Sequence, residues 1–189
     1  MTRAPRRAVF LDRDGVLNRV IVRAGRPYPP STPAELEVLP EAPGAVAALR
    51  AAGFLLIGVT NQPDVRRGTQ SREVVERINA ALLAALPGLT EIVVCYHDDG
   101  DACACRKPRP GLLTQAASRH GIDLASSFMV GDRWKDVEAG RRAGCTTIWI
   151  DCRYSERGPG VAADYTVRSL SEATEWILDH PVARHETRP

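Results

Sequence analysis

The sequence predicts an α/β protein built on one parallel β-sheet that helices cover on both faces. Short, continuous apolar runs alternate along the chain with segments of helical period, a pattern typical of βαβ units. Most of these runs lack the polar alternation of a half-solvated strand, so we expect them to be buried on both faces. Polar loops follow four of the runs. In such sheets ligands bind at the carboxyl ends of the strands, so these loops are the expected functional site.

The size and composition are those of one globular domain over residues 1–189. Hydrophobic residues make up 44% of the chain and charged residues 25%, and no apolar run approaches the ~20 residues needed to cross a membrane. The N-terminus lacks the apolar core of a secretory signal. We therefore expect a monomeric, cytoplasmic protein without membrane contact. The net charge of +2 is too small to favour nucleic acid, and the polar residues after about position 180 are expected to be disordered.

The first half of the chain is expected to contain three strands and two helices. The strands are the apolar runs at residues 8–11, 54–60 and 91–95, and the helices cover residues 43–52 and 71–86. Gly53 ends the first helix, and Ser71 is a suitable N-cap for the second. Residues 19–33 contain Gly25 and four prolines, so we expect a loop over the end of the first strand.

The second half is expected to continue the same alternation. Helices are expected over residues 111–120, 134–143 and 171–178, and strands over residues 128–131, 146–150 and 165–167. Gly121 and Gly144 follow two of these helices, as is common at helix C-termini. No internal repeat or linker divides the chain, so all the strands are expected to join one sheet.

Asp12 and Asp14 follow the first strand at a spacing of two residues. Two carboxylates so placed can divide the work of hydrolysis. One can attack phosphorus and bind a metal, while the other passes a proton to the leaving oxygen and later takes one from water. The pattern Asp-x-Asp-Gly also occurs in ordinary turns and calcium-binding loops, so this pair alone leaves the function open.

The loops after the other strands add groups that suit a bound phosphate. They contain Thr60, Asn61 and Gln62 after the second strand, Arg106 and Lys107 beyond the third, and Asp132, Arg133 and Asp136 after the fourth. The carboxyl ends of parallel strands meet at one edge, so these side chains are expected to converge. Carboxylates alone would repel a phosphate. The cluster therefore implies a divalent cation such as Mg²⁺, with Lys107 supplying fixed positive charge.

A group of cysteines and one histidine lies just before Lys107. The group consists of Cys95, His97, Cys103 and Cys105. Three thiolates and one imidazole match tetrahedral Zn²⁺, and four protein ligands are typical of a structural site rather than a catalytic one. The zinc would hold the loop over residues 95–105, and so would position Arg106 and Lys107 at the phosphate.

In order and content, the four loops resemble the motifs of the haloacid dehalogenase superfamily of phosphohydrolases, which have a Rossmann-like doubly wound sheet. The resemblance implies that Asp12 is a nucleophile that forms an aspartyl-phosphate, and that Asp14 is the general acid/base. It implies that Thr60 binds the transferring phosphoryl group and that Lys107 neutralises it. Asp132 would complete the Mg²⁺ site with Asp12 and the backbone carbonyl of Asp14.

The role of Asp136 is left open by this resemblance. It could orient Lys107. It could also bind the metal directly, or lie next to the metal ligands without binding it. It could also be a solvated residue in the first turn of the helix that follows the fourth strand.

The motifs Asp-Arg-Asp-Gly-Val, Thr-Asn-Gln and Cys-x-His…Cys-x-Cys-Arg-Lys-Pro resemble the histidinol-phosphate and heptose-bisphosphate phosphatase subfamily, which lacks a large cap domain. The resemblance implies a small phosphate ester as substrate, with D-glycero-D-manno-heptose 1,7-bisphosphate expected and histidinol phosphate as the alternative. Specificity would be set by residues 20–33, the zinc loop and Arg133. Asn61, Gln62, Arg106 and Arg133 would contact the sugar or its second phosphate.

Two features favour the heptose bisphosphate over histidinol phosphate. The chain holds one domain, and its arginines at positions 23, 26, 106 and 133 suit a second phosphate. The chain departs from the subfamily pattern at Pro63-Asp64, where a small residue and Gly are commoner, and in its short zinc loop, which the histidinol-phosphate enzymes also use. A polynucleotide 3′-phosphatase shares the first motif but is disfavoured by the near-neutral charge. A non-catalytic, zinc-stabilised binding module would have no need for so many carboxylates on one edge.

Overall fold

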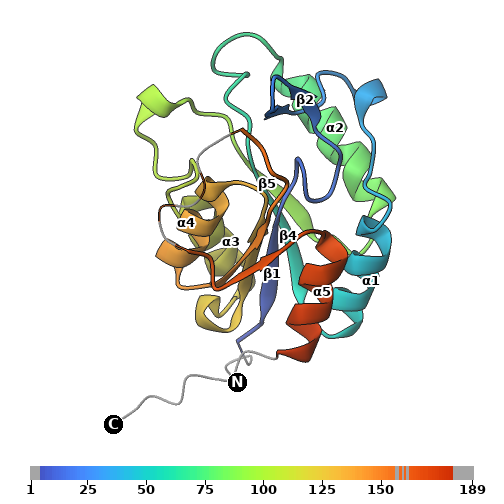
Figure 1. The fold of residues 1–189 in the computed structure, drawn as a ribbon. Helices are drawn as coiled ribbons and strands as arrows, with labels where there is room; N and C mark the ends of the chain where they lie inside the picture. The colour runs from blue at the N-terminus through green and yellow to red at the C-terminus, as the bar shows by residue number, and fades with distance from the viewer. Residues whose placement is uncertain (1–4, 156–157, 159, 161, 181–189) are drawn as a thin grey trace.

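The computed structural model describes residues 5–155, 158, 160 and 162–180. One six-stranded parallel sheet runs through them in the order β5-β4-β1-β6-β7-β8 (Figure 1). Its strands are β1 (Ala8–Asp12), β4 (Leu55–Asn61), β5 (Glu91–Cys95), β6 (Phe128–Gly131), β7 (Thr146–Ile150) and β8 (Tyr165–Val167). Because β1 lies between β4 and β6, the loops that follow these neighbours surround its carboxyl end. The disorder expected after residue 180 falls outside the described residues.

Within the described residues, five α-helices cover the two faces of the sheet, as the sequence predicts. One layer contains α1 (Ala42–Ala51), α2 (Arg72–Ala85) and α5 (Leu170–Asp179), and the other contains α3 (Gly111–His120) and α4 (Trp134–Ala143) (Figure 1). Ser71 caps α2 by accepting a hydrogen bond from the Val74 backbone N–H at 3.3 Å. The expected fold class is therefore confirmed.

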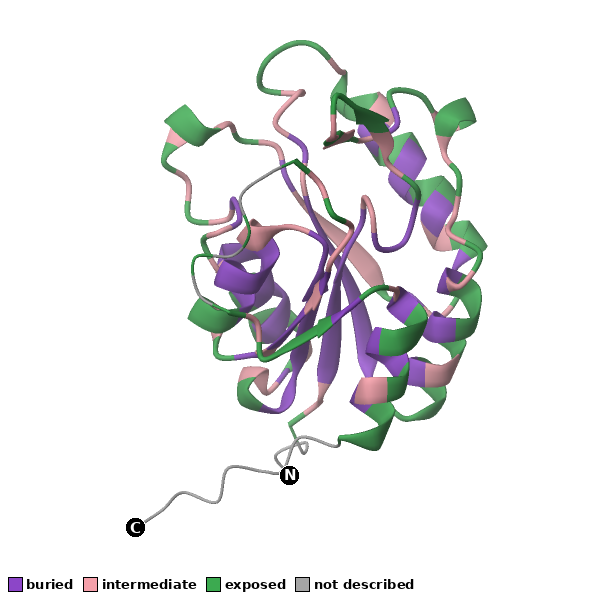
Figure 2. Ribbon diagram, in the orientation of Figure 1, coloured by how far each residue is buried: buried purple, intermediate pink, exposed green. Residues whose placement is uncertain are grey.

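Alternate residues of the central strand feed two separate apolar cores. Val9 and Leu11 face the layer with α1 and α5, whereas Ala8 and Phe10 face α3 and α4. All four side chains are fully buried, and the strand centres form the buried middle of the molecule in Figure 2. Burial on both faces explains why this strand is continuously apolar in sequence.

Residues 19–33 are not a plain loop, so that expectation was wrong. They contain a two-stranded antiparallel hairpin, β2 (Ile21–Arg23) and β3 (Arg26–Tyr28), near the carboxyl ends of β1 and β4 (Figure 1). Its turn residues Ala24 and Gly25 both have positive φ, at 49° and 73°, as a two-residue turn of type I′ requires. The Gly25 carbonyl accepts a hydrogen bond from the Ser155 backbone N–H at 2.8 Å. Within the described chain, no larger cap covers this edge of the sheet.

Candidate active site

Lys107 and Asp12 form the centre of the site at the end of β1. The Lys107 ammonium lies 2.6 Å from Asp12 Oδ1 and 2.6 Å from Asp136 Oδ1, and it donates to the Val59 carbonyl at 2.8 Å. Lys107 is only 2% exposed. Loops that follow three different strands thus deliver their charges to one point, as the sequence predicts.

The site holds more negative than positive charge. Burial, together with the charge of Asp136, raises the pKa of Asp12 to about 6, and Lys107 offsets this only in part. Burial followed by the charges of Asp12 and Asp136 raises the pKa of Asp132 well above its ordinary value. The pKa of Lys107 is also raised, because these carboxylates outweigh the effect of its burial. Three buried carboxylates therefore lie together at a site with one buried ammonium, which pairs with Asp12 and Asp136.

The surroundings of Asp132 indicate that a cation binds beside these carboxylates. Asp132 is 3% exposed, and within the described residues its carboxylate makes no hydrogen bond of good geometry, although the Tyr154 hydroxyl lies near enough to offset part of the rise in its pKa. Asp12, Asp132 and Asp136 each bring an oxygen within 4.8 Å of the others. A buried carboxylate with so little hydrogen bonding is costly, and oxygen ligands in this arrangement suit a hard divalent cation. The residues present therefore fit Mg²⁺.

Glycines let the carboxylates approach this closely. Gly15 has φ +92°, and a Cβ there would lie 1.9 Å from Asp132 Oδ2. A Cβ on Gly131 would lie 2.2 Å from the Cβ of Asp136. Any larger side chain at either position would displace a carboxylate from the site.

Asp136 connects Lys107 to the start of α4. Its Oδ1 contacts Lys107, and its Oδ2 accepts a hydrogen bond from the Arg133 backbone N–H at 3.0 Å. The residue is 1% exposed, so it is not the solvated helix residue that was one of the expected alternatives. Both of its oxygens already have partners.

The segment after β4 holds Lys107 from the other side. The Asn61 amide donates to the Lys107 carbonyl at 3.0 Å and accepts from the Lys107 backbone N–H at 3.1 Å. Thr60 Oγ1 accepts a hydrogen bond from Gln62 Nε2 at 2.9 Å. The Thr60 hydroxyl proton is thereby left to point toward another acceptor. Gln62 is 1% exposed, so its contacts lie beneath the site.

A cleft of about 320 Å³ opens above these groups. Its lining includes Asp12, Asp14, Thr60, Asn61 and Lys107, and also Pro27 and Tyr28 of the hairpin and the cations Arg26, Arg67, Arg133 and Lys135. Sequence reasoning missed Arg67 and Lys135, although Lys135 lies within the motif from Asp132 to Asp136. Gln62 and Arg106 are not part of the described lining.

Cys95, His97, Cys103 and Cys105 converge on one point beside this cleft. Cys105 Sγ lies 3.2 Å from Cys95 Sγ, 3.5 Å from Cys103 Sγ and 3.4 Å from His97 Nδ1. A bonded disulfide would need about 2.05 Å, whereas ligands about 2.3 Å from a tetrahedral zinc lie roughly 3.8 Å apart. Burial and the neighbouring Cys105 raise the pKa of the Cys95 thiol, so a bound cation would be needed to hold its thiolate.

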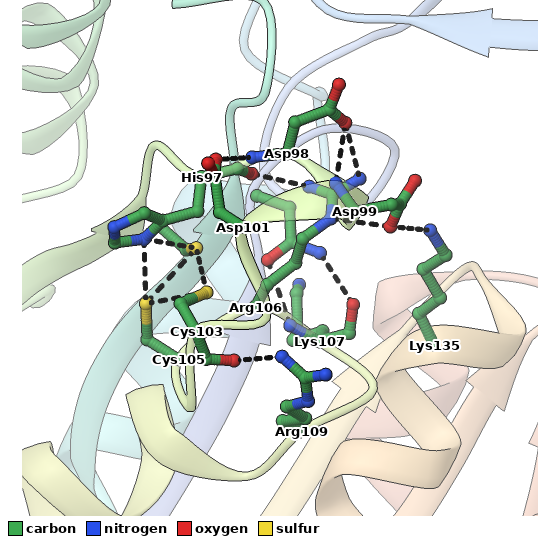
Figure 3. Close-up of polar contacts among 12 residues, drawn as sticks. His97, Asp98, Asp99, Asp101, Cys103, Cys105, Arg106, Lys107, Arg109 and Lys135 are labelled. Carbon is green, nitrogen blue, oxygen red and sulfur yellow. Dashed lines mark hydrogen bonds and ion pairs between the residues drawn. The ribbon is translucent and has the colours of Figure 1, made fainter. Parts of the chain in front are cut away.

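Acidic residues in the same loop bind the cations around it (Figure 3). Arg106 Nε donates to Asp99 Oδ1 at 2.8 Å, and its Nη1 donates to the His97 carbonyl at 3.2 Å. The ammonium of Lys135 lies 3.6 Å from the same Asp99 oxygen. Arg106 is thus turned toward the loop over residues 95–105 and links two of its residues.

A parallel sheet of this order, with a carboxylate at the end of β1 and a buried lysine opposite it, is the arrangement expected of a HAD-like hydrolase. A family model described as HAD-hydrolase-like matches residues 104–173. Curated heptose-1,7-bisphosphate 7-phosphatases match most of the chain. The protein from Mesorhizobium japonicum is 33% identical over 89% of this chain and 78% of its own, and that from Thermosynechococcus vestitus is 33% identical over 95% and 100%. The chain belongs to this phosphatase family.

Solved structures with a similar fold include phosphatases of the same kind as the sequence relatives. The D,D-heptose 1,7-bisphosphate phosphatase from B. bronchiseptica, complexed with magnesium and phosphate, superposes with a TM-score of 0.72 at 28% identity. The match covers 92% of this chain and 99% of that one. A HAD-like phosphatase from Mesorhizobium loti gives a TM-score of 0.74 at 28% identity, over 96% and 90%. Within the described residues, no helix is both long and apolar enough to cross a membrane.

Proposed function

We propose that this protein is a magnesium-dependent phosphatase that removes the 7-phosphate of D-glycero-D-manno-heptose 1,7-bisphosphate and leaves the heptose 1-phosphate. The observation that carries the proposal is the buried contact of Lys107 with Asp12 at the floor of a cleft with a cationic rim. The identity of the sugar is inferred from the names of the relatives, and the geometry of the site supports phosphate ester hydrolysis.

Magnesium would be held by Asp12, Asp132 and the backbone carbonyl of Asp14. When bound, it would neutralise the carboxylates and draw electron density from the phosphoryl oxygens. Asp136 is assigned to Lys107 rather than to the metal, because its two oxygens already contact Lys107 and the Arg133 backbone N–H.

Hydrolysis would occur in two steps through Asp12 and Asp14. In the first, an Asp12 oxygen attacks phosphorus, the bond from phosphorus to the sugar oxygen breaks, and Asp14 gives its proton to that oxygen. In the second, water attacks the aspartyl-phosphate while Asp14 takes a proton from the water, which releases phosphate and restores Asp12. Both residues line the cleft.

Thr60 and Lys107 would hold the phosphoryl group during both steps. The Thr60 oxygen accepts from Gln62, so its own proton can be donated to a phosphoryl oxygen. Lys107 places a positive charge where negative charge develops in the transition state. Asn61 fixes the backbone of Lys107 through two hydrogen bonds, and so contributes by positioning.

The cations at the rim of the cleft would recognise the second phosphate of the substrate. Arg133 and Lys135 line the cleft together with Arg26, and burial and the charges of Arg106 and Arg133 lower the pKa of Lys135. Neighbouring cations are stabilised when an anion binds between them. Arg106 would act through the zinc loop, since its guanidinium contacts Asp99 and the His97 carbonyl.

Zn²⁺ bound to Cys95, His97, Cys103 and Cys105 would hold the loop that precedes Lys107. The four donor atoms already lie within 4.8 Å of one another. All four are protein ligands, so the metal would have a structural role.

The test is the release of phosphate, with Mg²⁺ present, from the heptose bisphosphate and from L-histidinol phosphate at equal low concentrations. We expect a kcat/KM at least about tenfold higher for the bisphosphate, because only it can use the rim cations. A preference for histidinol phosphate would overturn the assignment of the heptose bisphosphate as substrate. Inactivity on both compounds would overturn the proposed function.

Asp12→Asn tests the nucleophile. Because the amide cannot attack phosphorus, we expect kcat to fall by at least about a thousandfold. Bound zinc and the circular dichroism spectrum should remain those of the wild type. Turnover equal to that of the wild type would refute the assignment of Asp12.

A further inference from the structure

Arg13, between the two aspartates of the first motif, is fully buried. It is 0% exposed and is among the largest side chains that the fold buries completely. A buried guanidinium must be paired with hydrogen-bond acceptors. Its backbone is fixed as well, because the Arg13 carbonyl accepts hydrogen bonds from the N–H groups of Leu17 and Asn18 at 2.9 and 3.1 Å. The side chain therefore has one well-defined position beneath the cleft.

Most of the hydrogen bonds of this guanidinium go to Asp14. Nε lies 3.1 Å from Asp14 Oδ1, and Nη2 lies 3.0 Å from Oδ1 and 2.8 Å from Oδ2. The remaining nitrogen, Nη1, donates to Asn79 Oδ1 in α2 at 2.8 Å. Asn79 is itself buried and lies 66 positions away in sequence. Arg13 thus links Asp14 to the packed face of a helix.

Two amides complete a cage of donors around Asp14. Asn18 Nδ2 donates to Oδ1 at 3.0 Å, and Gln62 Nε2 donates to Oδ2 at 2.8 Å. Side chains from the first loop and from the segment after β4 therefore restrain rotation of this carboxyl group. The side chain of Asp14 remains 15% exposed and lines the cleft, so the cage fixes the group without closing it off.

We infer that Arg13, anchored by Asn79, is a positioning residue that holds the Asp14 carboxyl group where it can exchange a proton with the leaving oxygen. The inference rests on the proposed function, in which Asp14 is the general acid/base. Proton transfer requires donor and acceptor to be placed within hydrogen-bonding reach. The forked guanidinium restrains both oxygens of Asp14 at once, which a lysine ammonium does not do.

The proton balance identifies the step that Arg13 supports. When the bond from phosphorus to a sugar oxygen breaks, the sugar leaves as an alkoxide unless Asp14 protonates it. When the leaving group is 4-nitrophenolate, the departing anion is stable and needs no proton. Loss of Asp14 positioning should therefore slow release of the sugar much more than release of nitrophenolate. General damage to the site would slow both, because both need Asp12 and Lys107.

Single-turnover kinetics of Arg13→Met, with enzyme in excess and Mg²⁺ present, test the inference. We expect release of heptose 1-phosphate from the heptose bisphosphate to slow by about a hundredfold, and release of 4-nitrophenolate from 4-nitrophenyl phosphate to slow by less than about fivefold. Arg13→Lys should fall between Arg13→Met and the wild type. Arg50→Met, at an exposed position in α1, is the matched control and should leave both rates unchanged.

Equal slowing of the two substrates in a folded variant would overturn the inference. Folding is checked by circular dichroism. If Arg13→Met does not fold, the same kinetics of Asn79→Leu test the inference, because this substitution removes only the residue that anchors Arg13. It should slow sugar release at least about threefold more than nitrophenolate release, and equal factors would again overturn the inference. Inactivity of the wild type on both esters would instead refute the proposed function, which separates the two failures.

Discussion

At the scale of single residues, the site is organised around an imbalance of charge. Asp12 and Asp136 form ion pairs with Lys107, whereas the Asp132 carboxylate makes no ion pair within the described residues and has only the nearby Tyr154 hydroxyl as a hydrogen-bonding neighbour. The geometry therefore separates two roles that look alike in sequence. Asp132 is suited to a metal, and Asp136 is suited to holding Lys107.

Asp136→Asn and Asp132→Asn should accordingly have different effects. Asp136→Asn keeps an acceptor for the helix N-terminus but removes the charge beside Lys107, so kcat should fall about ten- to hundredfold, or roughly 1.4–2.7 kcal/mol. The affinity of the Asp136→Asn variant for Mg²⁺ should change by less than about threefold. Asp132→Asn should weaken Mg²⁺ binding by at least about tenfold. Isothermal titration calorimetry with Mg²⁺ measures the affinity of both variants. Equal weakening of Mg²⁺ binding in the two variants would contradict the different roles assigned to Asp132 and Asp136.

Residue types and spacing predicted the convergence of Asp12, Lys107, Asp132 and Asp136 because each follows a recognisable strand. The environment of Arg13 could not be predicted in this way. An arginine is normally exposed, and its anchor Asn79 looks in sequence like a polar residue of a surface helix. Gln62 and Arg106 were expected at the substrate, but their partners are Asp14 and Asp99, which only the folded chain brings to them.

At the scale of elements, the loop over residues 95–105 links β5 to the lysine of the site. The four residues proposed to bind zinc lie at its two ends, and Arg106 and Lys135 contact Asp99 near its middle (Figure 3). The stability of this loop and the position of Lys107 should therefore depend on the same metal.

Cys103→Ser tests that dependence. Removing one thiolate should reduce bound zinc to well below equimolar and lower Tm by about 5 °C or more, since each kcal/mol shifts Tm by about 2–4 °C in a chain of this size. The kcat should fall as well, because the backbone of Lys107 is less well held. Cys145→Ala, at a buried cysteine outside the cluster, is the control and should retain zinc. Full zinc retention in Cys103→Ser, measured by metal analysis, would refute the ligand set.

Strong helical and apolar patterns made the larger elements predictable, whereas the hairpin of β2 and β3 was not. Its strands have three residues each, too few for alternation to show in sequence. The same Gly25 and Pro27 that indicated a loop lie in its turn and in its second strand. Short elements held by tertiary contacts, here the bond between Gly25 and Ser155, leave little trace in local sequence.

At the scale of the whole molecule, the buried carboxylates oppose the folding of the metal-free chain. In the folded protein the pKa of Asp12 is raised from 3.8 to about 6, chiefly by burial. The folded state thus binds this proton more tightly than the unfolded state does. The stabilisation from this proton is complete at low pH and is lost as the pH rises through about 6. Asp132 shifts in the same direction.

Protein stripped of metal should therefore have a lower Tm at about pH 7.5 than at about pH 5.5, and saturating Mg²⁺ should remove most of this difference by neutralising the ionised carboxylates. Thermal unfolding at both pH values, with chelator or with Mg²⁺, measures the effect. Asp12→Asn should show a smaller pH dependence without metal. A Tm that rises with pH equally in the wild type and in Asp12→Asn would contradict this account.

One sheet joins β1 to β8, and we propose that residues 1–189 form a single domain around it. The strands differ in their freedom to change. The first strand has neighbours on both sides in the main sheet, whereas the hairpin of β2 and β3 forms a separate two-stranded sheet and places Arg26, Pro27 and Tyr28 at the cleft. Residues of the hairpin can therefore change without repacking the main sheet. New substrate preferences can evolve through this peripheral hairpin, while the carboxylates and the lysine at the centre stay in place.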